Sequence, residues 1–221
     1  MLWRRMLELF EKGGVMMYPL LLCSVVAVAV IVERLINLRR KRILVPEIVA
    51  VLDQVKKEED FSLVHSVCQK FAGPFSELVI CCIENRDLPL EELRVTVEDE
   101  GRQQVRVLSR GLTALETIAG IAPLLGLLGT VLGMIQVFEI IQEMGVGQAK
   151  ALSGGISEAL ITTATGLIIG IPSLIAYNYF SARSQNLILD IEKYTMLLLN
   201  KIVRLRAAGA EESIQLNLRS E

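Results

Sequence analysis

The chain has 221 residues, of which 52% are hydrophobic and 22% charged, and its mean hydropathy is +0.48. This hydropathy is too high for an ordinary soluble domain, so we expect a membrane protein. The net charge of −2 lacks the basic excess of nucleic-acid-binding proteins, so we expect no nucleic-acid partner. Four cysteines without CxxC spacing and a single histidine argue against a disulfide framework and against a zinc site.

The first twelve residues favour a short amphipathic helix. Its apolar face would contain Leu2, Met6, Leu9 and Phe10. Such a helix can lie along the membrane interface, and Gly13-Gly14 would end it. A frayed tail is the alternative interpretation of residues 1–12.

Three uncharged stretches are long enough to cross a bilayer as helices, at about 20 apolar residues each. They are residues 13–32, 117–138 and 159–182. Arg4 and Arg5 precede the first stretch, as in a cleaved signal peptide, but its apolar run continues to Val32 and stops at charges. An uncleaved span has this form, so we expect three transmembrane helices.

The distribution of basic residues predicts the orientation of the spans. Lysine and arginine cluster after the first span, before the second and after the third, whereas residues 139–158 hold only Lys150. Basic residues mark the cytoplasmic side, so we expect a periplasmic N-terminus and a cytoplasmic C-terminus at a bacterial inner membrane. The run Arg39 to Arg42 could also bind anionic lipid headgroups, but topology alone accounts for it.

The sequence pattern of the segments outside the spans predicts helices and no strands. We expect a cytoplasmic helical region at 33–116, with breaks at Gly73-Pro74 and at 85–89, and a periplasmic loop with the start of the third helix at 139–158. Apolar residues at steps of three and four after Pro89 predict one unbroken helix running into the second span. A cytoplasmic helical extension and tail would follow at 183–221.

The third span should also extend well beyond its uncharged part. Its apolar stripe continues to Leu205, so a single helix from Gly155 to Arg206 is expected. Apolar stripes on helices outside the membrane need partners to cover them. The predicted fold is therefore an all-α integral membrane protein that assembles as an oligomeric bundle.

The second and third spans carry small and hydroxylated residues instead of charges. The glycines suited to close helix packing are Gly126, Gly129, Gly133, Gly166 and Gly170. The hydroxyls that could face a hydrated pathway are those of Thr130, Thr162, Thr163 and Thr165. Bonding of these threonines to their own backbone carbonyls is an equally open interpretation.

Two acids border these spans. Glu158 lies at the outer mouth of the third span, where it is either functional or simply extended toward water. Glu116 lies at the inner end of the second span and fits a solvated boundary residue. It remains a secondary candidate together with Thr162 and Thr165.

Two segments carry a family resemblance: APLLGLLGTVLGMI at 122–135 and GISEALITTATGLIIGIP at 155–172. They resemble the proton-channel family of ExbB, TolQ and the more distant flagellar MotA, with ExbB the most similar. The resemblance implies a homo-pentamer that encloses a single-span ExbD- or TolR-like partner with an intramembrane aspartate, acting on a TonB- or TolA-like energy-transducing protein. It also implies that Glu158, Thr130 and Thr163 belong to the proton pathway or contact the partner.

The resemblance implies a channel or motor subunit that uses the proton motive force, with no cofactor of its own. Glu116 departs from the family pattern, which has a small apolar residue there, and the choice between ExbB-type and TolQ-type duty stays open. A passive membrane scaffold is the alternative function. An enzyme is not expected, because the sequence lacks GxSxG, HExxH and P-loop motifs.

Overall fold

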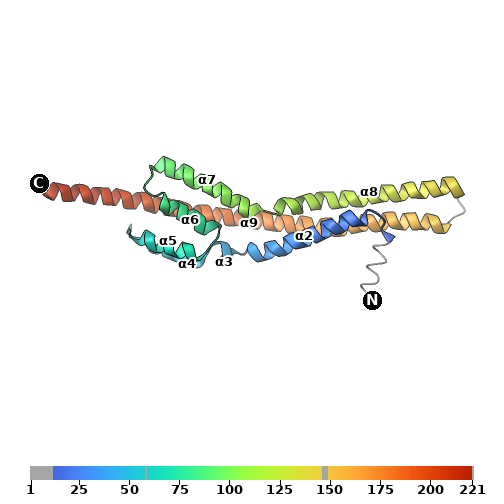
Figure 1. Ribbon diagram of the computed structural model, residues 1–221, viewed down its shortest axis with the longest axis horizontal. Coiled ribbons are helices and arrows are strands. Elements are labelled where there is room, and N and C mark those ends of the chain that lie inside the picture. The colour runs from blue at the N-terminus through green and yellow to red at the C-terminus, as the bar shows by residue number, and fades with distance from the viewer. Residues whose placement is uncertain (1–11, 58, 146–148, 221) are drawn as a thin grey trace. The chain divides into compact units, whose positions relative to one another are not determined.

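The computed structural model describes residues 12–57, 59–145 and 149–220, and this part of the chain forms helices and no strands (Figure 1). The predicted interfacial helix at 1–12 lies outside the described residues except for Lys12. The helices are α2 (Met17–Asn37), α3 (Arg40–Ile43), α4 (Pro46–Gln54), α5 (Asp60–Lys70), α6 (Pro74–Glu84), α7 (Leu90–Ser109), α8 (Leu112–Met144) and α9 (Ala149–Ser220).

The chain divides into two compact units. The first, here called the apolar unit, comprises the described parts of Met1–Leu35 and Gly111–Ser181, and the second, the polar unit, those of Ile36–Arg110 and Ala182–Glu221. Because α9 continues from one unit into the other, the final helix belongs to both.

Three helices are long and apolar enough to cross a membrane. They are Met17–Asn37, Leu112–Glu143 and Leu152–Gly209. Many of their large apolar side chains face outward, such as Leu124 at 63% exposure and Ile168 at 70%, as lipid-facing residues do. The all-α fold with three candidate spans is therefore confirmed.

Helices α8 and α9 extend beyond the uncharged stretches from which the second and third spans were predicted. α8 continues through Glu139 and Glu143, because backbone hydrogen bonding does not stop where the apolar residues stop. α9 runs 72 residues without interruption, with Pro172 inside it, so the prediction of one long helix through Arg206 is confirmed.

The prediction of an unbroken helix from the region after Pro89 into the second span is wrong. α7 ends at Ser109, and Gly111 adopts a left-handed conformation with φ of 77° before α8 begins. Leu108 and Leu112 are nevertheless both buried, so the apolar stripe keeps its spacing across the break. The spacing of the apolar residues therefore gave no sign that α7 ends. Gly111 was the available signal, because a glycine often follows the last turn of a helix.

The polar unit has its own apolar core. Helices α4 to α7 and the second half of α9 bury Ile48, Phe61, Phe75, Leu93 and Leu198 at 1% exposure or less. The rings of Phe75 and Tyr194 lie 5.9 Å apart and join α6 to α9. The breaks predicted at Gly73-Pro74 and at 85–89 are confirmed, because α6 begins at Pro74 and ends at Glu84.

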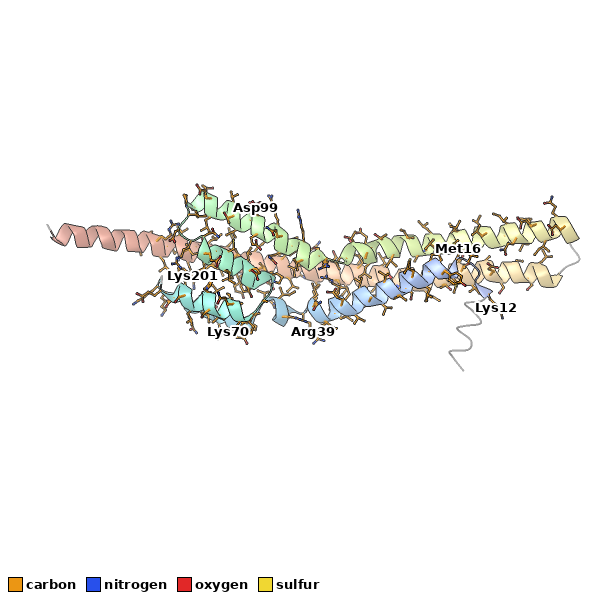
Figure 2. The ribbon with its side chains drawn as sticks, in the orientation of Figure 1. Lys12, Met16, Arg39, Lys70, Asp99 and Lys201 are labelled. Atoms are coloured by element: carbon orange, nitrogen blue, oxygen red, sulfur yellow. The ribbon has the colours of Figure 1, made fainter. Side chains whose placement is uncertain are left out.

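Basic side chains of α9 donate hydrogen bonds to backbone carbonyls at helix ends and turns of the polar unit. Lys201, labelled in Figure 2, donates to the carbonyls of Leu52 and Asp53 at the end of α4, at 2.6 and 3.1 Å. Arg183 donates to the carbonyl of Leu38 at 3.1 Å, and Arg206 to that of Leu88 at 2.7 Å. These cations satisfy carbonyls that helix ends and turns leave without a partner.

Candidate functional site

The contact between α8 and α9 in the apolar unit holds a pair of linked hydroxyls. Thr130 of α8 and Thr163 of α9 hydrogen-bond to each other. The Thr163 hydroxyl also reaches the carbonyl of Gly126 at 3.0 Å, and the Thr130 hydroxyl that of Ala159 at 3.3 Å. Both hydroxyls therefore face the opposite helix as well as each other.

The pair has more acceptors than protons. Each threonine hydroxyl carries one proton and two acceptor lone pairs, so these hydrogen bonds are alternatives and cannot all form at once. The two hydroxyls can exchange donor and acceptor roles by rotation about the C–O bond. Groups that both accept and donate a hydrogen bond are what a relay of protons requires.

Thr162 and Thr165 differ from this pair. Thr162 is buried and reaches the carbonyls of Glu158 and Ala159 at 2.8 and 3.0 Å, and Thr165 donates to Ile161 at 2.8 Å. These acceptors belong to the same helix. The structure thus separates the cluster into two threonines with acceptors in their own turn of α9 and one, Thr163, with partners in α8.

Close approach of the two helix backbones is what brings Thr130 and Thr163 together. A Cβ atom at Gly126 would lie 3.0 Å from the carbonyl oxygen of Thr162, and one at Gly166 would lie 2.5 Å from that of Ala122. The remaining positions are equally tight against the facing helix: Gly129 against Thr162, Gly133 against Gly155 and Gly170 against Pro123. Any larger residue would push α8 and α9 apart.

Glu158 borders a small cavity at one end of the apolar stretch of α9. The cavity has a volume of about 200 Å³, and its polar lining comes from Glu158, Thr162, Gln136 and Glu139. Residues 13, 15 and 16, in the turn before α2, and Gly129, Leu132 and Ile135 of α8 complete the wall. We call this the Glu158 cavity.

The carboxylate of Glu158 lies directly over Gly14. A Cβ atom at Gly14 would lie 2.6 Å from Glu158 Cδ and closer still to Oε1. Glu158 and Thr163 are about 140° apart around α9, which is why one faces the start of α2 while the other faces α8.

The opposite end of the apolar stretch holds a second polar pair. The hydroxyl of Tyr177 on α9 lies close enough to the carboxylate of Glu116 on α8 for the two groups to interact. Glu116 is exposed and Tyr177 half-buried. The acid that departs from the expected pattern thus has a partner on the neighbouring span.

The middle of the apolar unit lacks a carboxylate. Between Thr163 and Tyr177, α9 offers only the hydroxyls of Thr165 and Ser173, and Ser173 donates to the carbonyl of Ile169 in its own turn at 2.7 Å. This stretch is about 21 Å long at 1.5 Å per residue. A proton relay along it needs a titratable group from elsewhere.

Sequence reasoning did not assign Gly14, Gln136, Glu139 or Tyr177 to the site. Gln136 and Glu139 are three residues apart on α8, which places them on one helix face, but their approach to Glu158 depends on tertiary packing. The Gly13-Gly14 pair signalled a turn, without indicating which side chain the turn would meet.

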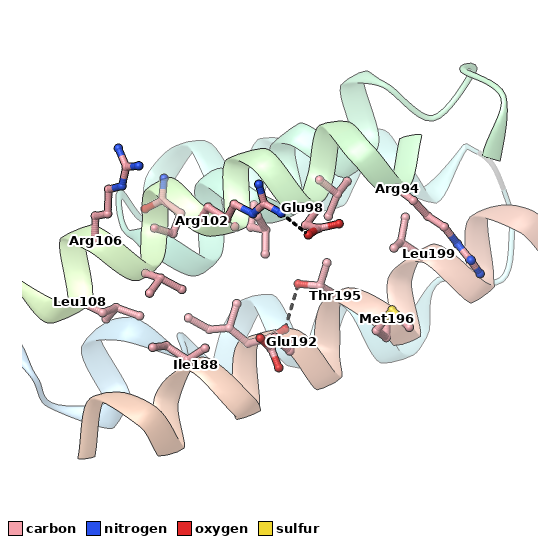
Figure 3. A pocket seen from close by; sticks show the side chains of 16 residues that line it. Arg94, Glu98, Arg102, Arg106, Leu108, Ile188, Glu192, Thr195, Met196 and Leu199 are labelled. Atoms are coloured by element: carbon pink, nitrogen blue, oxygen red, sulfur yellow. Dashed lines mark hydrogen bonds and ion pairs between the residues drawn. The ribbon is translucent and has the colours of Figure 1, made fainter. Parts of the chain in front are cut away.

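A cavity of about 710 Å³ lies in the polar unit between α7 and α9 (Figure 3). Its floor is apolar, and Arg94, Arg106 and Glu192 stand at its rim. Arg102 at the rim is already paired with Glu98 at 2.7 Å.

Comparison with known proteins finds a family model that covers most of these residues. A model of the MotA/TolQ/ExbB proton channel family matches residues 69–193, which is more than half of the chain. The match covers both threonines, Glu116, Glu158 and Tyr177, and it leaves out Gly14.

Individual relatives extend the similarity over most of the sequence. The chain is 34% identical over 189 residues to an ExbB-like biopolymer transport protein of Synechocystis, covering 83% of this chain and 74% of that protein. It is 30% identical over 189 residues to an ExbB homologue of Methanothermobacter thermautotrophicus, covering 84% and 66%. It is 38% identical over 107 residues to ExbB of Aquifex aeolicus, covering 48% and 72%.

Proposed function

The chain belongs to the MotA/TolQ/ExbB proton channel family, and on that premise we propose that it is a membrane subunit that couples proton movement to work on partner proteins. The observation that carries the proposal is the hydrogen bond between Thr130 of α8 and Thr163 of α9. This pair lies along the sequence of the two helices between Glu158 at one end of the apolar stretch and Glu116 at the other. One proton crossing a potential of 100 mV releases about 2.3 kcal/mol, which can bias a conformational step of packed helices.

The proposed pathway is shared with another chain. Glu158 collects or releases protons at one end, the Thr130–Thr163 pair relays them, and a single-span ExbD- or TolR-like protein contributes an intramembrane aspartate. That carboxylate fills the gap between Thr163 and Tyr177, where this chain supplies none. A TonB- or TolA-like protein would receive the mechanical work.

The proposed assembly is a homo-pentamer around the partner helices. Small residues on α8 and α9 allow close packing, and the large exposed apolar side chains of both helices need lipid or protein neighbours. The N-terminus would face the periplasm and the C-terminus the cytoplasm, because the basic residues flank the ends of the spans that join 33–116 and 183–221.

A passive scaffold is the competing proposal. The glycine contacts between α8 and α9 would serve a scaffold equally well. The scaffold does not need the hydroxyl pair or the Glu158 cavity, so the two proposals differ in whether those polar groups matter.

Proton flux into vesicles tests the choice. The purified chain should conduct few or no protons under an imposed pH gradient, and flux should appear when the ExbD- or TolR-like partner is reconstituted with it. Strong flux from this chain alone would overturn the shared pathway. Absence of flux from the complex under both an imposed pH gradient and a membrane potential would favour the scaffold.

A further inference from the structure

We infer that Gly14 is a positioning residue that sets the place of the Glu158 carboxylate. This inference deepens the proposed function and rests on it for its physiological meaning. Its physical content concerns only the contact between the turn at the start of α2 and the side chain of Glu158.

The turn itself is well defined. Gly14 has a φ of 64°, a left-handed conformation that suits glycine, and its carbonyl accepts a hydrogen bond from the N–H of Met17 at 3.2 Å. Tyr18 then bonds to the carbonyl of Val15 at 3.3 Å, which starts α2. The backbone at Gly14 is therefore held by the first turn of the helix.

The Glu158 carboxylate occupies the space that a side chain at position 14 would need. Glu158 Cδ would be 2.6 Å from such a Cβ and Cγ 3.3 Å. Both distances are below ordinary van der Waals contact, so the carboxylate would have to leave its place. The hydrogen at Gly14 is what allows Glu158 to remain half-buried at the cavity wall.

The neighbouring glycine provides a matched control. A Cβ atom at Gly13 would meet Met17 Cγ and Sδ, at 2.5 and 2.6 Å. These atoms belong to a flexible side chain that can rotate away, and Gly13 has no left-handed φ. Gly13→Ala should therefore disturb the turn without moving Glu158.

Two further variants separate carboxylate displacement from backbone strain. Asparagine tolerates a left-handed φ better than alanine, yet it carries the same Cβ, so Gly14→Asn should displace Glu158 as Gly14→Ala does. Combining Gly14→Ala with Glu158→Asp shortens the acid by one methylene and withdraws the oxygen that the Cβ atom meets first. The displacement in this double variant should therefore be smaller than in Gly14→Ala.

The test is chemical labelling of Glu158 in membranes that contain the full chain. A water-soluble carbodiimide with glycine ethyl ester would modify accessible carboxylates, and mass spectrometry would compare Glu158 with the exposed Glu143 in the same molecule. We expect Gly14→Ala and Gly14→Asn to raise the Glu158 to Glu143 ratio severalfold, because a carboxylate that has left its half-buried place at the cavity wall is more accessible to the reagent. Gly13→Ala should leave the ratio unchanged.

The outcomes separate this inference from the proposed function. An unchanged ratio in both Gly14 variants overturns the positioning role, whatever their activity. A changed ratio with full proton-coupled activity upholds the positioning role and refutes the part of the proposed function that assigns Glu158 to the pathway. A changed ratio in Gly14→Ala but not in Gly14→Asn assigns the effect to backbone strain and also overturns the inference.

Discussion

Thr130 on α8 and Thr163 on α9 hydrogen-bond through their hydroxyl groups, although 33 positions separate them in the sequence. The contact exists because glycines let the two backbones approach, as Gly126 does beneath Thr163. The close packing of α8 against α9 is therefore what allows the two hydroxyls to bond. A change to either threonine tests whether the hydroxyls have more than a packing role.

Replacing Thr130 or Thr163 by valine should impair proton-coupled activity while keeping the side-chain volume nearly constant. Each change removes a hydroxyl that is shared between helices, at a stability cost of about 0.6 kcal/mol for an interhelical hydrogen bond in a membrane. The measurement is proton flux of the reconstituted complex at matched protein level. Thr165→Val is the control, because its hydroxyl bonds to Ile161 in its own helix, and equal flux in all three variants would contradict the relay.

Glu158→Ala should abolish energy transduction and leave membrane insertion intact. An acid at the membrane boundary contributes little to insertion, but Glu158 lines a cavity at one end of the apolar stretch and stands at the end of the proposed pathway. Activity is compared with that of Glu143→Ala, which removes an exposed acid of α8 outside the cavity lining. Wild-type activity of Glu158→Ala would show that the side chain only extends toward water.

Glu116→Ala and Tyr177→Phe should be energetically coupled. Each removes one partner of the same polar contact, so the double variant should lose less than the sum of the single losses, by about 1 kcal/mol. Thermal unfolding in detergent micelles measures the coupling. Strict additivity would mean that the two side chains do not interact in the folded protein.

Lys201→Met should destabilise the polar unit by about 2 kcal/mol, because a charged donor to two carbonyls at the end of α4 is lost while the aliphatic length is kept. Denaturant unfolding of the purified protein measures the loss. Arg204→Met, an exposed substitution one turn further along α9, is the matched control and should have a small effect.

The cysteines test the proposed orientation. Burial raises the pKa of Cys68 to about 11 and that of Cys82 to about 12, so both thiols stay protonated and react slowly at pH 8 in the folded protein. Thiolate forms, and labelling accelerates, only as the pH rises toward these values.

A membrane-impermeant thiol reagent should therefore leave Cys68, Cys81 and Cys82 unmodified in intact cells. After lysis in denaturant, all three should react, because unfolding returns their pKa values to the ordinary range. Labelling of any of the three from outside intact cells would overturn the proposed topology.

The helices and spans were predictable because their signals are local. Apolar runs near 20 residues and the proline at position 74 act within a few turns of chain, and α6 begins at Pro74 as expected. Gly111 was missed because the buried positions Leu108 and Leu112 keep a helical step across the break. The spacing of apolar residues therefore predicted correctly which residues are buried, but predicted wrongly that the helix is continuous.

The partners within the site were not predictable in the same way. Glu116 meets Tyr177, and Glu158 meets Gly14, across long stretches of sequence. Such pairs depend on how α2, α8 and α9 pack, which periodicity does not encode. The sequence could therefore nominate Glu158, Thr130 and Thr163 individually without showing that only the two threonines touch.

The break at Gly111 also has a mechanical side. Between α7 and α8 the chain passes through Gly111, a left-handed glycine at which the helical bonding of α7 has ended and that of α8 begins, with the Leu115 N–H donating to the Gly111 carbonyl. α9 has no such joint, since its hydrogen-bonded turns continue from Ala149 to Ser220. The chain therefore has a glycine joint between α7 and α8, whereas any twist within α9 has to strain hydrogen-bonded turns.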